Sequence, residues 1–217
     1  MPPTVLIPVN RLDRAKGRLA ALLEPEERAE LVRRSLSAVL AAVEGAGMVA
    51  VVLTSDEGVR TVLLADVRVL SEDPHLQGLS AQLEWAGGLL GVDELLILHA
   101  DLPLVTAEAL RDLVAQAPEA PSATLVRPAD GGTNAMLLRP PGRFPLAYGR
   151  GSGDLHEAAA REAGLAVRRA DAPALVLDLD TPSDVRALLS TAEGRASEAG
   201  GYLVEIGIEG REAYGEG

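Results

Sequence analysis

Val5-Leu6-Ile7-Pro8-Val9 is a short apolar run that gives way, after Asn10, to the basic loop Arg11-Leu12-Asp13-Arg14-Ala15-Lys16-Gly17-Arg18. The run predicts a buried strand, and the loop concentrates an excess of three positive charges just beyond it. Lys16 is the single lysine among the 20 basic residues of the chain. A compact ammonium on a flexible stem suits a point contact with a phosphate, which is how we interpret Lys16; a surface lysine without a chemical role is the alternative.

The same pattern of a short apolar run followed by a longer helical pattern recurs along the chain. The clearest helix follows Pro25 and stops at Gly45, because its apolar residues fall on one helical face: Val32, Leu36, Val39, Leu40 and Val43. Strands are expected at Val5–Val9, Val49–Thr54, Val67–Leu70, Glu94–His99, Ala123–Arg127 and Asn134–Arg139, with two weaker ones near Ala166–Arg168 and Leu175–Asp178. Further helices are expected at Asp56–Ala65, Leu79–Leu90, Thr106–Ala117, Gly153–Ala163 and Pro182–Leu189, the last with Thr181 as its N-cap.

This alternation predicts an α/β fold, with a mostly parallel central sheet and helices on both of its faces. Ligands of such folds collect at the carboxyl ends of the strands, where the strand order reverses. We expect one domain over residues 1–190. Residues 191–217 are expected to form either a frayed tail or an added edge strand around Tyr202–Ile206, which could pair with a second subunit in a homodimer.

The bulk composition excludes several classes of function. The 217 residues carry a net charge of −12, which opposes binding to nucleic acid. The chain contains no cysteine, which rules out thiolate catalysis and Cys-zinc sites, and its three histidines show no metal spacing. Without an apolar run long enough for a bilayer, and without a visible signal peptide, we expect a cytoplasmic protein with no membrane contact.

Carboxylates follow two of the expected strands. Asp101 comes directly after the run that ends at His99, and Asp178 and Asp180 precede the last expected helix. Mg²⁺ prefers one or two such carboxylates together with phosphate oxygens, and residues i and i+2 of an extended segment share a face. Capping of a helix by Asp101 is the alternative, although Thr106 is better placed for it, and the capping alternative stays open for Asp180. His99, with no nucleophile evident beside it, is interpreted as structural.

Two glycine-rich segments could bind anions. One is Gly131-Gly132-Thr133-Asn134, and the other is Tyr148-Gly149-Arg150-Gly151-Ser152-Gly153, which leads into a helix. Exposed backbone N–H groups and a helix N-terminus both favour anions, although ordinary loops remain the alternative. Together with the basic loop and the carboxylates, these segments indicate metal-assisted transfer of a nucleotidyl group between two anions.

The ordered set of motifs resembles the guanylyltransferases of coenzyme F420 biosynthesis, the CofC/FbiD family, over about residues 4–189. It consists of Ile7-Pro8-Val9 with Ala15-Lys16-Gly17-Arg18-Leu19, Asp101-Leu102-Pro103, Gly131-Gly132-Thr133-Asn134-Ala135, Tyr148-Gly149-x-Gly-Ser152 with His156, and Asp178-x-Asp180-Thr181-Pro182. Asp-Leu-Pro and Asp-Thr-Pro also occur in related molybdenum-cofactor nucleotidyltransferases. The two glycine-rich segments are therefore what point to this family.

The resemblance implies a Rossmann-like nucleotidyltransferase fold and transfer of GMP from GTP to a phosphorylated three-carbon acid, phosphoenolpyruvate or 2-phospho-L-lactate, with release of pyrophosphate. It implies a Mg²⁺ ion held by Asp101 and Asp178, with Asp180 in support. Lys16 and Arg18 would contact the GTP phosphates near the turn that contains Leu79 and Ser80. Thr133, Gly149 and Ser152 would hold the acceptor. The implied catalytic residues are Lys16, Asp101 and Asp178.

Three positions depart from the family pattern. Asn10, Ala100 and Ser80 stand where relatives commonly carry lysine, glycine and asparagine. The first and third leave the details of base and phosphate recognition open. Two other functions remain as alternatives at this point: a nucleotidyltransferase acting on a molybdopterin-type cofactor, and a non-catalytic module that binds GTP.

Overall fold

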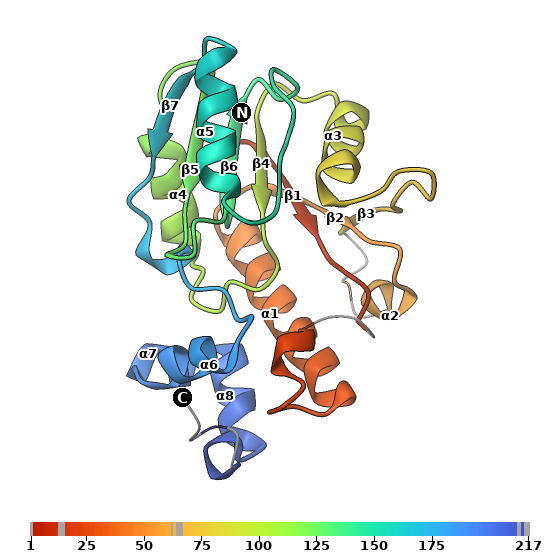
Figure 1. The fold of residues 1–217 in the computed structure, drawn as a ribbon, viewed down its shortest axis with the longest axis vertical. Coiled ribbons are helices and arrows are strands. Elements are labelled where there is room, and N and C mark those ends of the chain that lie inside the picture. Colours follow the sequence, from red (N-terminus) through yellow and green to blue (C-terminus); the bar gives the residue numbers. More distant parts are fainter. Residues whose placement is uncertain (1, 13–15, 62, 64–66, 212–213, 215–217) are drawn as a thin grey trace.

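The computed structural model describes residues 2–12, 16–61, 63, 67–211 and 214. Its centre is a sheet of seven strands with helices on both faces (Figure 1). The strands are β1 (Thr4–Pro8), β2 (Val49–Leu53), β3 (Arg68–Leu70), β4 (Leu95–Leu98), β5 (Ser122–Val126), β6 (Ala135–Arg139) and β7 (Ala166–Arg169). The helices are α1 (Pro25–Gly45), α2 (Glu57–Arg60), α3 (Leu79–Leu90), α4 (Ala107–Gln116), α5 (Ser152–Glu162), α6 (Pro182–Leu189), α7 (Ala192–Ala196) and α8 (Glu198–Glu205).

The strand order places a ligand crevice between β1 and β4. The order is β3-β2-β1-β4-β6-β5-β7, and all neighbours are parallel except β6, which is antiparallel to both β4 and β5. From β1 the chain proceeds outward through β2 and β3, and then returns to place β4 on the other side of β1. The two strands therefore leave an open crevice beyond their carboxyl ends.

Both faces of the sheet are covered, as the unbroken apolar runs of β1 and β4 predict. On β4, Leu96 and Leu98 pack with residues of α1 and α4, whereas Leu95 and Ile97 pack on the opposite face with residues of α3 and α5. Because neighbouring residues of this strand face opposite sides, none of its four side chains is accessible to solvent. The mostly parallel sheet and its two helical layers are thus confirmed.

A third core cluster lies below the carboxyl ends of the strands and includes the C-terminal segment. It contains Leu19, Leu22, Leu23, Leu31, Leu179, Val185, Leu188, Leu189, Ala199, Tyr202, Leu203 and Ile208. The run Tyr202–Ile206, a candidate edge strand in the sequence, lies in and directly after α8, and this helix packs against α1 (Figure 1). The edge-strand alternative is therefore wrong, because the apolar side chains here close a helical cluster.

Two further expectations need correction. The weak strand at Leu175–Asp178 is instead the end of a 3₁₀ turn over Pro173–Leu175 and an irregular segment, which is bound to the sheet by side-chain hydrogen bonds from Asn134. The helix expected over Asp56–Ala65 is observed only as the single turn of α2, and part of its remaining range lies outside the described residues. None of the described helices is both long and apolar enough to cross a membrane.

Replacing Leu203 with alanine tests whether the C-terminal segment is part of the folded unit. Leu203 is 0% exposed in the third core cluster, so Leu203→Ala should lower the free energy of unfolding by about 3 kcal/mol. Val204 is its neighbour on the same helix and is 42% exposed, so Val204→Ala should change that free energy by less than about 1 kcal/mol. Urea unfolding followed by circular dichroism measures both. Equal effects would show that α8 does not bury Leu203.

Candidate functional site

A cavity of about 430 Å³ opens at the carboxyl ends of β1 and β4. It lies at the crevice that the strand order predicts, because Pro8 to Asn10 and His99 to Asp101 form part of its wall. Most of the candidate site residues singled out in the sequence also line it. They are Lys16, Leu79, Asp101, Thr133, Gly149, Ser152, Asp178 and Asp180.

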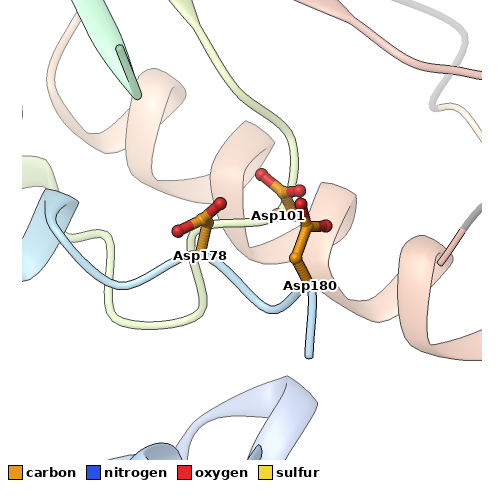
Figure 2. Close-up of side chains that lie close together, drawn as sticks. All are labelled: Asp101, Asp178 and Asp180. Carbon is orange, nitrogen blue, oxygen red and sulfur yellow. The ribbon is translucent and has the colours of Figure 1, made fainter. Parts of the chain in front are cut away.

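Three aspartates converge on one side of this cavity (Figure 2). Asp101 follows β4, and Asp178 and Asp180 lie on the segment that leads into α6; one carboxylate oxygen of each lies within 4.8 Å of those of the other two. Leu179 between them is fully buried in the third core cluster, so its two neighbours face the other way, toward Asp101. The backbone N–H of Leu179 donates to the Asp101 carbonyl at 3.2 Å, which fixes the two segments side by side.

Asn134 holds the aspartate segment against the sheet. Its buried side-chain amide donates to the carbonyls of Leu175 and Val176 at 3.0 and 2.9 Å. The backbone carbonyl of Asn134 accepts a hydrogen bond from the backbone N–H of His99 at 3.0 Å. Through its side-chain amide and its backbone carbonyl, this one residue thus links the approach to Asp178 with the start of β6 and the end of β4, which explains why this irregular segment needs no strand pairing.

Lys16 neutralises part of the charge of this cluster. Its ammonium donates to Asp180 Oδ1 at 2.8 Å and to Asp101 Oδ2. Burial alone would lower the pKa of Lys16, but the attraction of Asp101 and Asp180 outweighs it and raises this pKa. Burial would likewise raise the pKa of Asp101, and Lys16 reverses that shift. Both groups therefore remain charged across the neutral pH range.

One ammonium does not compensate three carboxylates. Burial, followed by repulsion from Asp101 and Asp180, raises the pKa of Asp178 to about 6. In addition, Asp101 Oδ1 is buried and has no hydrogen-bond partner among the residues that the structure describes. Excess negative charge and a carboxylate oxygen without a hydrogen-bond partner both favour the binding of a hard divalent cation. The triad is thus suited to hold such a cation.

Another part of the cavity wall carries hydroxyl groups on a rigid support. Thr133 Oγ1 lies 3.0 Å from Ser152 Oγ and 3.1 Å from His156 Nδ1. The backbone N–H of Ala147 donates to His156 Nε2 at 2.9 Å, so this nitrogen is an acceptor and the neutral imidazole carries its proton on Nδ1. Burial lowers the pKa of His156 to about 4, which keeps the ring neutral and its hydrogen bonds in place.

Close backbone approach joins the two glycine-rich segments. The N–H of Gly153 donates to the Gly131 carbonyl at 3.0 Å, and a Cβ on Gly153 would lie 2.2 Å from Arg127 Nε. Arg127 in turn binds Glu157, which is almost fully buried and also pairs with Arg169. Only glycine fits at position 153, because any side chain would displace the arginine that supports both segments.

Two of the predicted nucleotide-binding residues lie outside the cavity wall. Ser80 Oγ accepts a hydrogen bond from the backbone N–H of Tyr148 at 2.8 Å. Arg18 is exposed and lines an adjoining hollow that shares Asp178 and Asp180 with the cavity. Conversely, His99 and Tyr148 lie in the wall, although neither was predicted as a site residue. The only sequence signal for His99 is its place at the end of β4, two residues before Asp101.

A sequence model of the family described as "Guanylyl transferase CofC like" matches residues 3–215. The chain belongs to this family. It is 39% identical over 211 residues to the phosphoenolpyruvate guanylyltransferase of Sphaerobacter thermophilus, and this match covers 91% of this chain and 97% of the relative. It is 33% identical over 207 residues to the 2-phospho-L-lactate guanylyltransferase of Halorubrum lacusprofundi, covering 94% and 93% of the two chains.

The fold agrees with this assignment. A candidate nucleotide-diphospho-sugar transferase from Desulfovibrio desulfuricans superposes with a TM-score of 0.78 at 18% identity, and the match covers 99% of each chain. The predicted nucleotidyltransferase fold is thus confirmed, and the CofC-family protein is an enzyme of the nucleotidyltransferase class.

The neutral state of the His156 ring predicts how the free energy of unfolding changes as the pH falls. Its folded-state pKa of about 4 lies below the usual 6.5, so the unfolded chain binds more protons between these two values. The contribution of His156 to stability is therefore complete above about pH 6.5 and is lost as the pH falls toward 4. His156→Gln should reduce the loss of unfolding free energy between pH 7 and pH 5 by about 2 kcal/mol, as measured by urea unfolding. The exposed His75→Gln is the matched control, and an unchanged pH slope in His156→Gln would contradict the neutral-ring assignment.

Proposed function

We propose that this enzyme transfers GMP from GTP to phosphoenolpyruvate or 2-phospho-L-lactate, with release of pyrophosphate, in the biosynthesis of coenzyme F420. The observation that carries the proposal is the convergence of Asp101, Asp178 and Asp180 beside Lys16, in the same cavity as the hydroxyls of Thr133 and Ser152. One cavity thereby offers a cation site and an anion site, as a transfer between two phosphate-bearing substrates requires.

In this proposal, Asp101 and Asp178 hold Mg²⁺ and Asp180 supports them. The unpaired Asp101 Oδ1 and the raised pKa of Asp178 favour a cation at this place. When bound, Mg²⁺ supplies positive charge that neutralises the phosphate oxygens around the reacting phosphorus.

Lys16 and Arg18 bind the GTP phosphates, and the turn with Leu79 and Ser80 lies near the nucleotide. The Lys16 ammonium contacts Asp180, and both residues line the cavity, so the ammonium can exchange a carboxylate for a phosphate oxygen by rotating its flexible stem. Arg18 lies beside the same carboxylates in the adjoining hollow. Basic groups on two sides of the triad would then hold the triphosphate in one orientation.

Thr133, Gly149 and Ser152 bind the acceptor, whose phosphate oxygen attacks the α-phosphorus of GTP. The new bond forms between these two atoms, the bond from the α-phosphorus to the bridging oxygen breaks, and its electrons leave with pyrophosphate. The attacking oxygen is already ionised near neutral pH, so no general base is needed. The enzyme has to align two anions and reduce the repulsion between them.

We propose phosphoenolpyruvate as the first acceptor to test. The relative from Sphaerobacter thermophilus, at 39% identity, carries that name, whereas the relative named for 2-phospho-L-lactate is 33% identical.

Replacing Asp101 with asparagine tests the cation site. Asp101→Asn keeps the size of the side chain but removes its charge, so GTP- and acceptor-dependent pyrophosphate release should fall at least ~100-fold. The control is Asp112→Asn, an exposed carboxylate on α4 that should leave the rate unchanged. Turnover by Asp101→Asn at the wild-type rate would contradict the role of the triad. Binding of GTP without pyrophosphate release from any acceptor would favour a nucleotide-binding module.

Replacing Lys16 with glutamine tests whether its ammonium interacts with both the carboxylates of the triad and the phosphates of GTP. Without the ammonium, the triad gains net negative charge, so the affinity for Mn²⁺ in the absence of nucleotide should rise about 10-fold, as measured by titration calorimetry. The KM for GTP should rise in the same variant because a phosphate contact is lost. Arg111→Gln, which removes an exposed positive charge on α4, should change neither value. Weaker Mn²⁺ binding by Lys16→Gln would show that the lysine does not compete for the carboxylates.

A further inference from the structure

Two neutral polar groups in the cavity wall have no assigned role. His99 Nε2 and the Tyr148 hydroxyl are both buried, and neither has a hydrogen-bond partner within the described part of the chain. The same condition holds for Asp101 Oδ1 in the same cavity. A buried polar atom without a partner destabilises a fold by about 1–3 kcal/mol, so a cluster of them in one cavity indicates atoms that a ligand satisfies.

These groups are held rigidly, so their unpaired atoms are not the result of free side-chain rotation. The Tyr148 ring lies between His99, with ring centroids 5.6 Å apart, and His156, at 4.8 Å in an edge-to-face arrangement. The backbone N–H of Tyr148 is fixed by Ser80, and both nitrogens of His156 have partners. A chain with only five aromatic residues thus places one of them against two of its three histidines.

We infer that His99 Nε2 and the Tyr148 hydroxyl bind the carboxylate of the three-carbon acceptor and thereby select phospho-acids over simple phosphate esters. This inference rests on the proposed function and extends it to two residues that determine acceptor specificity.

The chemistry of the two groups determines which part of a substrate they bind. Burial raises the pKa of Tyr148 far above its usual range, so its hydroxyl stays protonated and donates a hydrogen bond. We assign the proton of the neutral His99 ring to Nε2, so that this nitrogen donates as well. Two neutral donors suit an anionic oxygen, and they do so without drawing the cation away from the aspartates.

The position of the pair favours the carboxylate over the phosphate of the acceptor. His99 lies two residues before Asp101, and the Tyr148 ring contacts His156, whose Nδ1 binds Thr133. The pair therefore lies between the cation site and the hydroxyls of Thr133 and Ser152. When the acceptor phosphate reacts next to the cation, the carboxylate of the three-carbon acid is the anionic group that can reach these donors.

Tyr148→Phe is the decisive variant because it removes one oxygen and keeps the ring. Because the hydroxyl has no partner in the fold, the unfolding temperature should stay the same or rise, while the KM for the acceptor rises about 10- to 100-fold and the KM for GTP is unchanged. His99→Phe, which keeps a ring against Tyr148, should shift the acceptor KM in the same direction. The control is Tyr202→Phe in the third core cluster, which should leave both KM values unchanged.

A substrate without the carboxylate completes the test. The wild-type enzyme should use isopropenyl phosphate, in which a methyl group replaces the carboxylate of phosphoenolpyruvate, far less well. Tyr148→Phe should lower kcat/KM for this ester by less than twofold. An equal loss with both substrates, a lowered unfolding temperature, or an unchanged acceptor KM would overturn the inference. Failure of the wild-type enzyme to release pyrophosphate with any acceptor would instead overturn the proposed function, and the inference with it.

Discussion

The contact between one ammonium and the aspartate triad is the interaction on which the geometry of the site depends. Three carboxylates with oxygens within 4.8 Å repel one another, and the chain compensates only part of that repulsion through Lys16. The remaining negative charge is visible in the raised pKa of Asp178. A folded protein retains such an arrangement only where surrounding packing enforces it, so the physical question is what holds these groups together.

The third core cluster supplies that packing from three directions. Leu19, Leu22 and Leu23 anchor the loop that follows Lys16, Leu179 anchors the aspartate segment, and α6 and α8 close the cluster from the C-terminal end. The same apolar contacts thus place the ammonium and two of the carboxylates. This explains why a segment that reads as a weakly patterned tail is helical and buried: without it, the two charged elements would have no common support.

Because buried parallel strands and capped helices have strong local patterns, the sequence was sufficient to predict the sheet and its two helical layers. Most of the candidate site residues chosen from the sequence also line the cavity. Prediction from the sequence failed where tertiary contacts replace local signals. The segment before Asp178 is held by the Asn134 amide from a distant strand, and α8 forms because a face for its apolar side chains exists on α1. His99 and Tyr148 escaped prediction for a related reason: an unpaired atom is a property of the assembled cavity, and no residue spacing encodes it.

Two sets of polar atoms in the cavity wall are held in opposite ways, and this difference follows from what each set has to do. Thr133, Ser152 and His156 satisfy one another, with the imidazole kept neutral by burial, so their geometry is fixed before any ligand arrives. Asp101 Oδ1, His99 Nε2 and the Tyr148 hydroxyl are left unsatisfied within the described chain. A transfer between two anions gains most from groups that are already oriented and not yet paired, because neither rotation nor loss of an internal hydrogen bond then opposes binding. Leaving these three atoms unpaired lowers the stability of the fold, but it keeps them oriented and available when a ligand binds.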